Sequence, residues 1–264
     1  MNTENFNNFL DIFGHKVSAD GKDKKIILPK MNEIHRANIA NKTSLISVIM
    51  PEGITRIGDS AFYGWESLTS VTIPNSVTTI GDCAFEYCYS LTSVTIPEGV
   101  TSIGICAFTE TSLTSVAIPD SVTSIGEQAF RNCTSLTNVT IGNGLTNIDA
   151  YTFNGCESLT SVTIGNSVTR IGIAAFFGCK SLKSVTIPDS VACIGKNAFN
   201  ACSSGLTIYG KSGSYAEEYA KNNNFKFKGS LKEWILINLI VFSTTLNIRC
   251  QVMAKIKRLS YRQI

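Results

Sequence analysis

Histidine is nearly missing from this chain of 264 residues, which contains only His15 and His35. Both lie within the first 44 residues, and histidine is the side chain most often used for acid–base chemistry and metal binding near neutral pH. Its scarcity argues against most histidine-based catalysis and most zinc sites in the rest of the chain. The remaining enzyme hypothesis, the less favoured one, places a site in residues 1–44 around these two side chains.

Charged residues are also scarce, at 16% of the chain, and their signs are unevenly distributed. Residues 45–205 carry 6 basic and 12 acidic side chains, whereas residues 206–264 carry 10 basic and 3 acidic ones. A nucleic-acid-binding protein concentrates positive charge on its folded body. Because the central part of this chain is acidic, we expect no nucleic-acid partner.

Other signatures of chemistry and export are missing too. No GxGxxG or Walker loop occurs, and the nine cysteines contain no C-x-x-C pair. We therefore expect no catalytic residues, no cofactor and no metal, and a protein that is not an enzyme. The first residues, MNTENFNNFL, lack the basic start and apolar run of a signal peptide. That favours a cytoplasmic location with free thiols.

A repeat of about 23 residues is the dominant feature of the chain. Leucines recur at spacings of 22 to 24 and delimit seven full units, each close to L-T-S-V-T-I-P-x-S-V-T-x-I-G-x-x-A-F-x-x-C-x-S. The leucines are Leu45, Leu68, Leu91, Leu113, Leu136, Leu159, Leu182 and Leu206. Such periodicity is typical of a solenoid, in which each unit packs only on its neighbours.

Each unit predicts a short strand, a turn and a corner. Val71 and Ile73 alternate with Ser70 and Thr72, which is the pattern of a strand with one buried face. A Pro- or Gly-containing turn follows, and then a recurrent glycine such as Gly81, for which we expect a corner with positive φ. A phenylalanine column forms the expected spine of the core. Its members are Phe62, Phe85, Phe108, Phe130, Phe153, Phe176 and Phe199.

The sequence at this point resembles the BspA-type leucine-rich repeat family. The residues that carry the resemblance are the strand, corner and A-F-x-x-C segments, as in LTSVTIPNSVTTIGDCAFEYC at 68–88. The resemblance implies an α/β solenoid, mainly β, in which about seven 23-residue units form a right-handed stack with parallel strands on the concave face. It also implies a non-catalytic module for protein–protein interaction or adhesion at a cell surface. A purely structural or decaying family member without a dedicated ligand is the alternative.

The flanks predict a division into four parts. Residues 1–44 are an N-terminal cap in which KIILP, at 25–29, marks a degenerate repeat, and residues 45–205 hold the seven repeats. Residues 206–228 form a closing segment, with a short helix at 214–221 begun by a capping box of Ser214 and Glu217. Residues 229–264 are an apolar and then basic tail. We favour packing of residues 234–262 on the stack over contact with a membrane.

Cysteines occupy one slot of the repeat in most units. Cys88, Cys133, Cys156, Cys179 and Cys202 share this slot, and Trp65 takes it in the first unit. Because a tryptophan is no metal ligand, the slot indicates a packing position, and free cysteine is a small buried apolar residue. Cys83, Cys106 and Cys193 look scattered and receive the same interpretation.

The binding surface is the least determined feature. The outward strand residues form a uniform surface of small polar side chains, without the Trp, Tyr and Arg that dominate binding energy. They are Ser70, Thr72, Ser93, Thr95, Ser115, Ala117, Asn138, Thr140, Ser161, Thr163, Ser184 and Thr186. The loops of the first two units differ, and Tyr63, Trp65, Tyr87 and Tyr89 are the candidate partner-binding residues there, with side packing as the alternative reading. We expect a monomer that binds a protein or a glycan.

Overall fold

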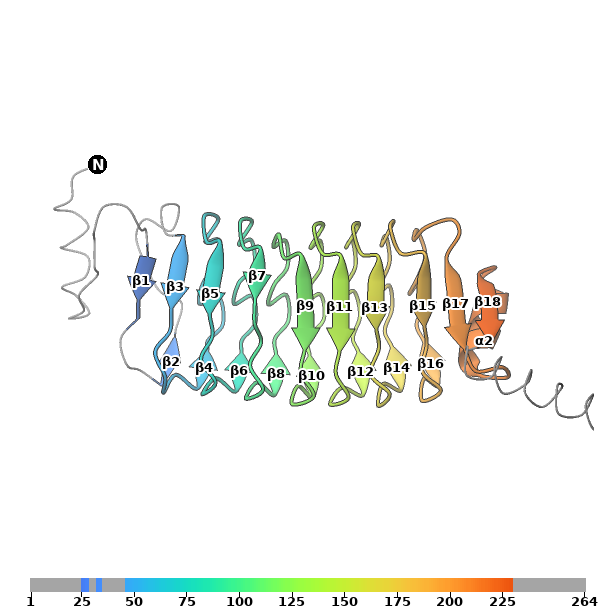
Figure 1. Ribbon diagram of the computed structural model, residues 1–264, viewed down its shortest axis with the longest axis horizontal. Coiled ribbons are helices and arrows are strands. Elements are labelled where there is room, and N and C mark those ends of the chain that lie inside the picture. The colour runs from blue at the N-terminus through green and yellow to red at the C-terminus, as the bar shows by residue number, and fades with distance from the viewer. Residues whose placement is uncertain (1–24, 29–31, 35–45, 230–264) are drawn as a thin grey trace, which may run out of the picture.

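A computed structural model describes residues 25–28, 32–34 and 46–229, with side chains omitted for 25–27. The chain winds into an elongated, nearly straight stack of turns (Figure 1). Two rows of short parallel strands run along the stack, and each turn contributes one strand to each row. The alternating apolar pattern predicts such strands. The fold is therefore the parallel β-solenoid expected from the repeat, with almost no helix.

The first row of strands carries the V-x-I part of each unit. Its partners are aligned at the repeat spacing, so that Val71 pairs with Val94 and Val139 with Val162. The strands are β1 (Lys25–Ile27), β3 (Ser47–Ile49), β5 (Ser70–Thr72), β7 (Ser93–Val94), β9 (Ser115–Ile118), β11 (Asn138–Ile141), β13 (Ser161–Thr163), β15 (Ser184–Thr186), β17 (Thr207–Gly210) and β18 (Lys226–Gly229).

The second row follows the turn of each unit and consists of two-residue strands. Each ends on a buried isoleucine, such as Ile57 or Ile80, which points into the core. The strands are β2 (Glu33–Ile34), β4 (Arg56–Ile57), β6 (Thr79–Ile80), β8 (Ser102–Ile103), β10 (Ser124–Ile125), β12 (Asn147–Ile148), β14 (Arg170–Ile171) and β16 (Cys193–Ile194).

The phenylalanine column forms the spine of the core, as predicted. All seven rings are 0% exposed, and successive ring centroids are 5.1–5.4 Å apart with interplanar angles of 2–12°. Trp65 meets the first ring edge-on at 5.0 Å, and Tyr219 meets the last, Phe199, at 6.2 Å. Because each ring lies between two others, the units stabilise one another in a single continuous core.

The recurrent glycines serve a different purpose from the one predicted. Gly81, Gly104 and Gly126 do not have positive φ. Instead, a Cβ atom at Gly126 would lie 2.4 Å from the backbone nitrogen of Ile105 in the preceding unit. The prediction of a positive-φ corner was wrong, because these positions need glycine for close backbone approach.

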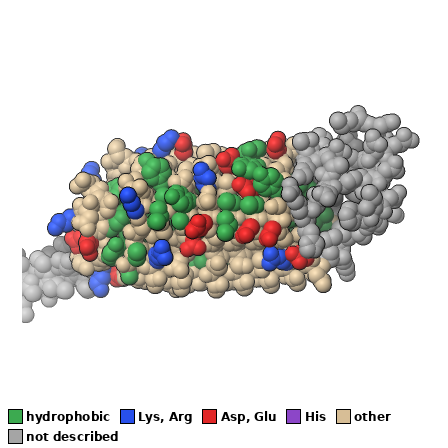
Figure 2. All heavy atoms as spheres, turned by 180° about the vertical axis from the view of Figure 1, so that it is seen from behind, with side chains coloured by type: hydrophobic (Ala, Val, Ile, Leu, Met, Phe, Trp, Pro, Cys, Tyr) green, Lys and Arg blue, Asp and Glu red, His purple; other side chains and the backbone are tan. Residues whose placement is uncertain are grey.

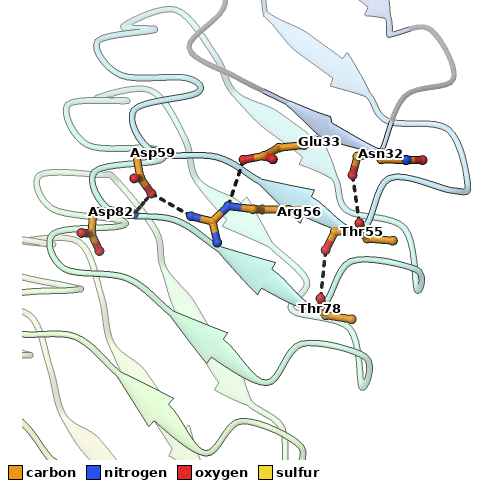
Figure 3. A network of polar contacts seen from close by, with 7 residues as sticks. All are labelled: Asn32, Glu33, Thr55, Arg56, Asp59, Thr78 and Asp82. Atoms are coloured by element: carbon orange, nitrogen blue, oxygen red, sulfur yellow. Dashed lines mark hydrogen bonds and ion pairs between the residues drawn. The ribbon is translucent and has the colours of Figure 1, made fainter.

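Polar side chains tie each unit to the one before it (Figure 3). The Thr78 hydroxyl donates to the Thr55 carbonyl at 3.0 Å, and Thr55 donates in the same way to Asn32. The Arg56 guanidinium contacts Glu33 at 3.0 Å and Asp59 at 3.3 Å. These contacts hold residues 32–34 to the first full turn. β1 also pairs with β3 in register. The degenerate first repeat and the other boundaries proposed for the chain stay predictions.

The described C-terminal end is covered by a short helix, α2 (Tyr215–Asn222), which buries Ala216, Tyr219 and Ala220. The helix matches the prediction, but its capping box does not. The Ser214 hydroxyl makes no capping bond, and the Glu217 carboxylate accepts a hydrogen bond from the Gly213 N–H at 2.6 Å. Glu217 thus reaches one residue further back than a capping box requires. No helix within residues 25–28, 32–34 and 46–229 has the length and apolar character needed to cross a membrane.

Candidate functional site

The segment around each phenylalanine forms a third row of contacts between units. In this segment the N–H groups of Ser60, Phe62 and Gly64 donate to carbonyls of the following unit at 2.7–2.8 Å. Two residues per unit, four positions apart, have positive φ, as at Cys83 (53°) and Tyr87 (61°). This geometry presents non-repeating side chains at the surface. Figure 2 shows hydrophobic side chains lying among acidic and basic ones on the face opposite to that of Figure 1.

The cysteine slot is an interior packing position, as the sequence indicates. The thiols of Cys88 and Cys156 donate to the carbonyls of Phe62 and Phe130 in the preceding unit, both at 3.2 Å. Burial raises the pKa of Cys88 to about 12. Within the described part of the chain all eight cysteines are free thiols. The repeated cysteine therefore satisfies a buried carbonyl, a role that the spacing alone did not reveal.

Three tyrosines of the first two units meet at the surface. The rings of Tyr63 and Tyr87 are in edge-to-face contact at 5.4 Å, and Tyr87 contacts Tyr89 at 5.9 Å. Tyr89 is 47% exposed, while Tyr63 and Tyr87 are half-buried. We call these three residues the tyrosine cluster. It brings together three of the four residues proposed from the sequence.

Trp65 does not belong to this surface, and its proposed role in partner binding was wrong. Its side chain is 0% exposed and packs edge-on against Phe62. It occupies the slot that cysteine fills in later units, and every described residue of that slot is buried or half-buried. The slot assignment already indicated packing, so the repeat register would have separated Trp65 from the tyrosines.

The tyrosine cluster lies in an acidic environment. The negative charge of Glu86 is the main cause that raises the pKa of the neighbouring Tyr87, with smaller contributions from burial and from Tyr63 and Glu110. Tyr87 thus presents its phenol group beside a carboxylate. Aromatic rings with polar ends next to acids suit a partner with apolar and basic groups.

The interpretation of Cys83 and Cys106 as scattered cysteines was wrong. The two residues occupy the same column in adjacent units. The Cys83 N–H donates to the Ile105 carbonyl at 2.8 Å, which aligns the two cysteines. One donor atom each of Cys83, Glu86 and Cys106 lies within 4.8 Å of the other two. Burial, the hydrogen bond to Glu86 and the charge of Glu86 raise the pKa of Cys83 to about 12.

The outward residues of the first strand row are exposed, as predicted. Ser70, Thr72, Ser161 and Thr163 alternate with buried valines, and the pattern is the same from turn to turn. The threonines that precede β7, β9, β11 and β13 each donate to the carbonyl of the corresponding threonine one unit earlier, as in Thr137 to Thr114 at 2.9 Å. From β5 to β15 the outward residues of this row are Ser or Thr except at Ala117 and Asn138, so the row is nearly uniform along the stack.

A shallow hollow of about 320 Å³ lies beside the second strand row. Arg56, Asp59 and Asp82 line its polar side, and Ile105 lines its apolar side. The Asp59 carboxylate is engaged by the Asp82 N–H at 3.0 Å and by Arg56, as Figure 3 shows. Because these polar groups bond to one another, the hollow is a product of unit-to-unit contacts and not a formed ligand site.

Solved structures with the same architecture come from bacteria. A leucine-rich repeat protein from Bacteroides ovatus has 26% sequence identity and a TM-score of 0.55, over 78% of this chain and 60% of that one. The T. pallidum Leucine Rich Repeat protein (TpLRR) has 31% identity and a TM-score of 0.57, over 61% of this chain and 79% of that one. The chain thus spans less than two thirds of the Bacteroides ovatus protein.

The sequence profile of the "BspA type Leucine rich repeat region (6 copies)" matches residues 32–158 and 101–228. Together the two matches cover well over half of the chain and coincide with the stacked units. No curated protein matches the chain. With the phenylalanine spine, the two strand rows and the A-F-x-x-C segments in place, the chain belongs to the BspA-type leucine-rich repeat family.

Proposed function

We propose that the stack is a non-catalytic interaction module and that a protein partner docks on the tyrosine cluster. The observation that carries this proposal is the contact of Tyr63, Tyr87 and Tyr89 at the surface of an otherwise repetitive scaffold. Tyrosine is among the residues that contribute most to binding free energy. A glycan stacked on the rings is the alternative ligand.

The uniform strand row supports the same proposal by contrast. A surface that repeats Ser and Thr residues in nearly every turn cannot by itself fix a partner at one place along the stack. The tyrosine cluster differs from the corresponding positions of later units, such as Asn132 and Gly155 in the column of Tyr87. Specificity needs such unlike residues.

The family resemblance extends the proposal to adhesion at a cell surface, with the module acting as a monomer. The family is one of binding scaffolds in general, and the part of the chain that the structure describes contains neither His15 nor His35. An enzymatic site in residues 1–44 therefore lies outside the described residues. The same holds for membrane contact through residues 234–262.

The test is capture of a partner with the full chain as bait, followed by affinity measurement with Tyr87→Ala plus Tyr89→Ala. We expect binding to weaken by more than about 1 kcal/mol, about fivefold in Kd. Ala201 has φ 55° in the column of Tyr87, so alanine is compatible with that backbone. The thermal unfolding midpoint should change little.

Tyr151→Ala is the matched control, because Tyr151 is 41% exposed and has φ 59°, yet lies several turns from the cluster. It should leave affinity unchanged, as should Thr140→Ala and Thr163→Ala on the strand row. Capture that is lost when the partner preparation is treated with periodate would identify a glycan. If the tyrosine pair destabilises the fold and leaves affinity intact, the cluster is packing and the purely structural alternative gains support.

A further inference from the structure

Cys83, Glu86 and Cys106 form the only group of three or more potential ligands with mutually close donor atoms in the described ranges. The two sulfurs belong to neighbouring turns, and the carboxylate reaches them from a tight turn in which the Glu86 N–H donates to the Cys83 carbonyl at 3.2 Å. All three side chains are half-buried. They are thus partly shielded from water but open on one side.

We propose that Cys83, Cys106 and Glu86 bind a thiophilic divalent cation of the zinc class. Two thiolates and one carboxylate are a ligand set that such cations accept, and the open side leaves a fourth position for water. Two sulfurs bound to a tetrahedral zinc at about 2.3 Å lie about 3.8 Å apart, so movements of about 1 Å complete the geometry. This proposal does not rest on partner binding at the tyrosine cluster.

Charge supports the assignment. The Glu86 carboxylate places a negative charge beside both thiols, which favours a cation at this point. Asp82 adds a further negative charge near Cys83, while Arg131 acts on Cys106 in the opposite sense.

The backbone also supports it, because the ligands stand on a fixed frame. Cys83 and Cys106 have φ of 53° and 54°, and their units are joined by the Cys83 N–H to Ile105 and Phe85 N–H to Ala107 bonds, each 2.8 Å. Both sulfurs therefore project from the same point of consecutive turns. A frame of this kind positions ligands before the cation arrives.

The repeated cysteines of the interior do not offer such a site. Cys133 and Cys156 are 0% exposed, and each thiol donates to a phenylalanine carbonyl at 3.2 Å. No carboxylate joins any of them in a group of three ligands within the residues described. The combination of two aligned thiols with a carboxylate is confined to the column of Cys83.

The test uses the full chain, reduced with a thiol-free reductant and titrated with Cd²⁺ as the probe. Formation of cadmium–thiolate bonds is followed by ultraviolet charge-transfer absorption. We expect one cadmium per chain to produce this signal at the proposed site. Cys83→Ser and Cys106→Ser should each abolish that part of the signal, and Glu86→Gln should weaken the affinity by at least about tenfold.

Cys193→Ser is the matched control, because Cys193 is an exposed free thiol outside the group, and it should retain the signal. Serine suits the backbone of both ligand positions, since Ser60 has φ 56° in the same column. Unfolding midpoints without cadmium should therefore match the wild type, and only the wild type and the control should be stabilised by cadmium. Equal cadmium signals in the wild type and Cys83→Ser, or no uptake by the fully reduced protein, would overturn the proposal. Recovery of Cys83 and Cys106 as a disulfide, with no cadmium bound after reduction, would also overturn it.

Discussion

The interior of the stack and its loop surface, meaning the exposed side chains of the A-F segments, follow opposite rules. In the interior the same residue type recurs turn after turn, as in the seven stacked phenylalanines. On the loop surface the residue changes with almost every turn, as in the column of Ser60, Cys83, Gln128 and Tyr151. The repeated interior residues stabilise the stack, whereas the non-repeating surface residues give individual turns different side chains for binding. The first three turns hold both the tyrosine cluster and the thiol pair, meaning Cys83 and Cys106.

The largest expected effect is the removal of an interior ring. Phe130→Ala should lower the free energy of unfolding by about 3–5 kcal/mol, because it leaves a cavity between Phe108 and Phe153, whose centroids lie 5.2 and 5.4 Å away. Denaturant unfolding measures the change. Phe177→Ala, at a 38% exposed position on the loop surface, is the control and should cost far less. Equal costs would erase the distinction between interior and surface.

Gly126→Ala should cause the next largest loss of unfolding free energy. A Cβ atom there would lie 2.4 Å from the Ile105 nitrogen and 2.7 Å from the Gly104 carbonyl carbon, so the turns must separate, at a cost of about 1–3 kcal/mol. The control is Gly205→Ala, where no atom lies within 4 Å of the added Cβ and φ is not positive. Its effect on the unfolding free energy should stay within about 0.5 kcal/mol.

Cys156→Ala tests the interior cysteine slot. It removes one buried atom and the thiol bond to Phe130, so the unfolding free energy should fall by about 0.5–1.5 kcal/mol, as for deletion of one buried methyl group. Cys193→Ala, at an exposed position, should be neutral. Added reductant should leave both melting midpoints unchanged. A marked loss of stability on reduction would indicate disulfides in the folded protein.

A further expected effect concerns pH and the interior thiols. Burial raises the pKa of Cys88 to about 12 and of Cys133 to about 11, above the value of 9.0 of a free thiol. The folded state therefore binds more protons than the unfolded state in this range. The stability that these thiols contribute is full below pH 9 and is lost as the pH rises through 11 to 12. Unfolding at pH 8 and pH 11 should show a smaller loss for Cys88→Ala than for the wild type.

The repeat allowed most of the fold to be predicted, because each interior column has one member per turn. The strands, the phenylalanine spine, the exposed Ser and Thr residues and the helix at Tyr215–Asn222 all follow from local patterns that recur or are self-contained. The glycine column was correctly predicted to require glycine, but the predicted cause, a positive φ, was wrong. Spacing shows that a side chain is excluded at Gly126, but not whether the cause is φ or a neighbouring backbone.

The loop surface was harder to predict, because a residue that occurs in only one or two turns cannot be compared with the same residue in the other turns. Cys83 and Cys106 are 23 positions apart, the repeat length, yet only two turns have cysteine there and the pair was taken for scattered thiols. Trp65 was grouped with tyrosines by residue type, although its slot is interior. Aligning every turn by its phenylalanine, and reading the variable columns first, would have separated both cases.

The exchangeability of the interior columns has a consequence for the length of the molecule. Deleting residues 136–158 removes one whole turn and joins two matching edges, so that Phe130 would stack on Phe176. The rod would shorten by about 4.8 Å, the distance between neighbouring strands. The tyrosine cluster and the thiol pair would remain intact but lie one step nearer to the C-terminal helix. The length of the stack can therefore change by whole turns, while the tyrosine cluster and the thiol pair near its N-terminal end keep their structure.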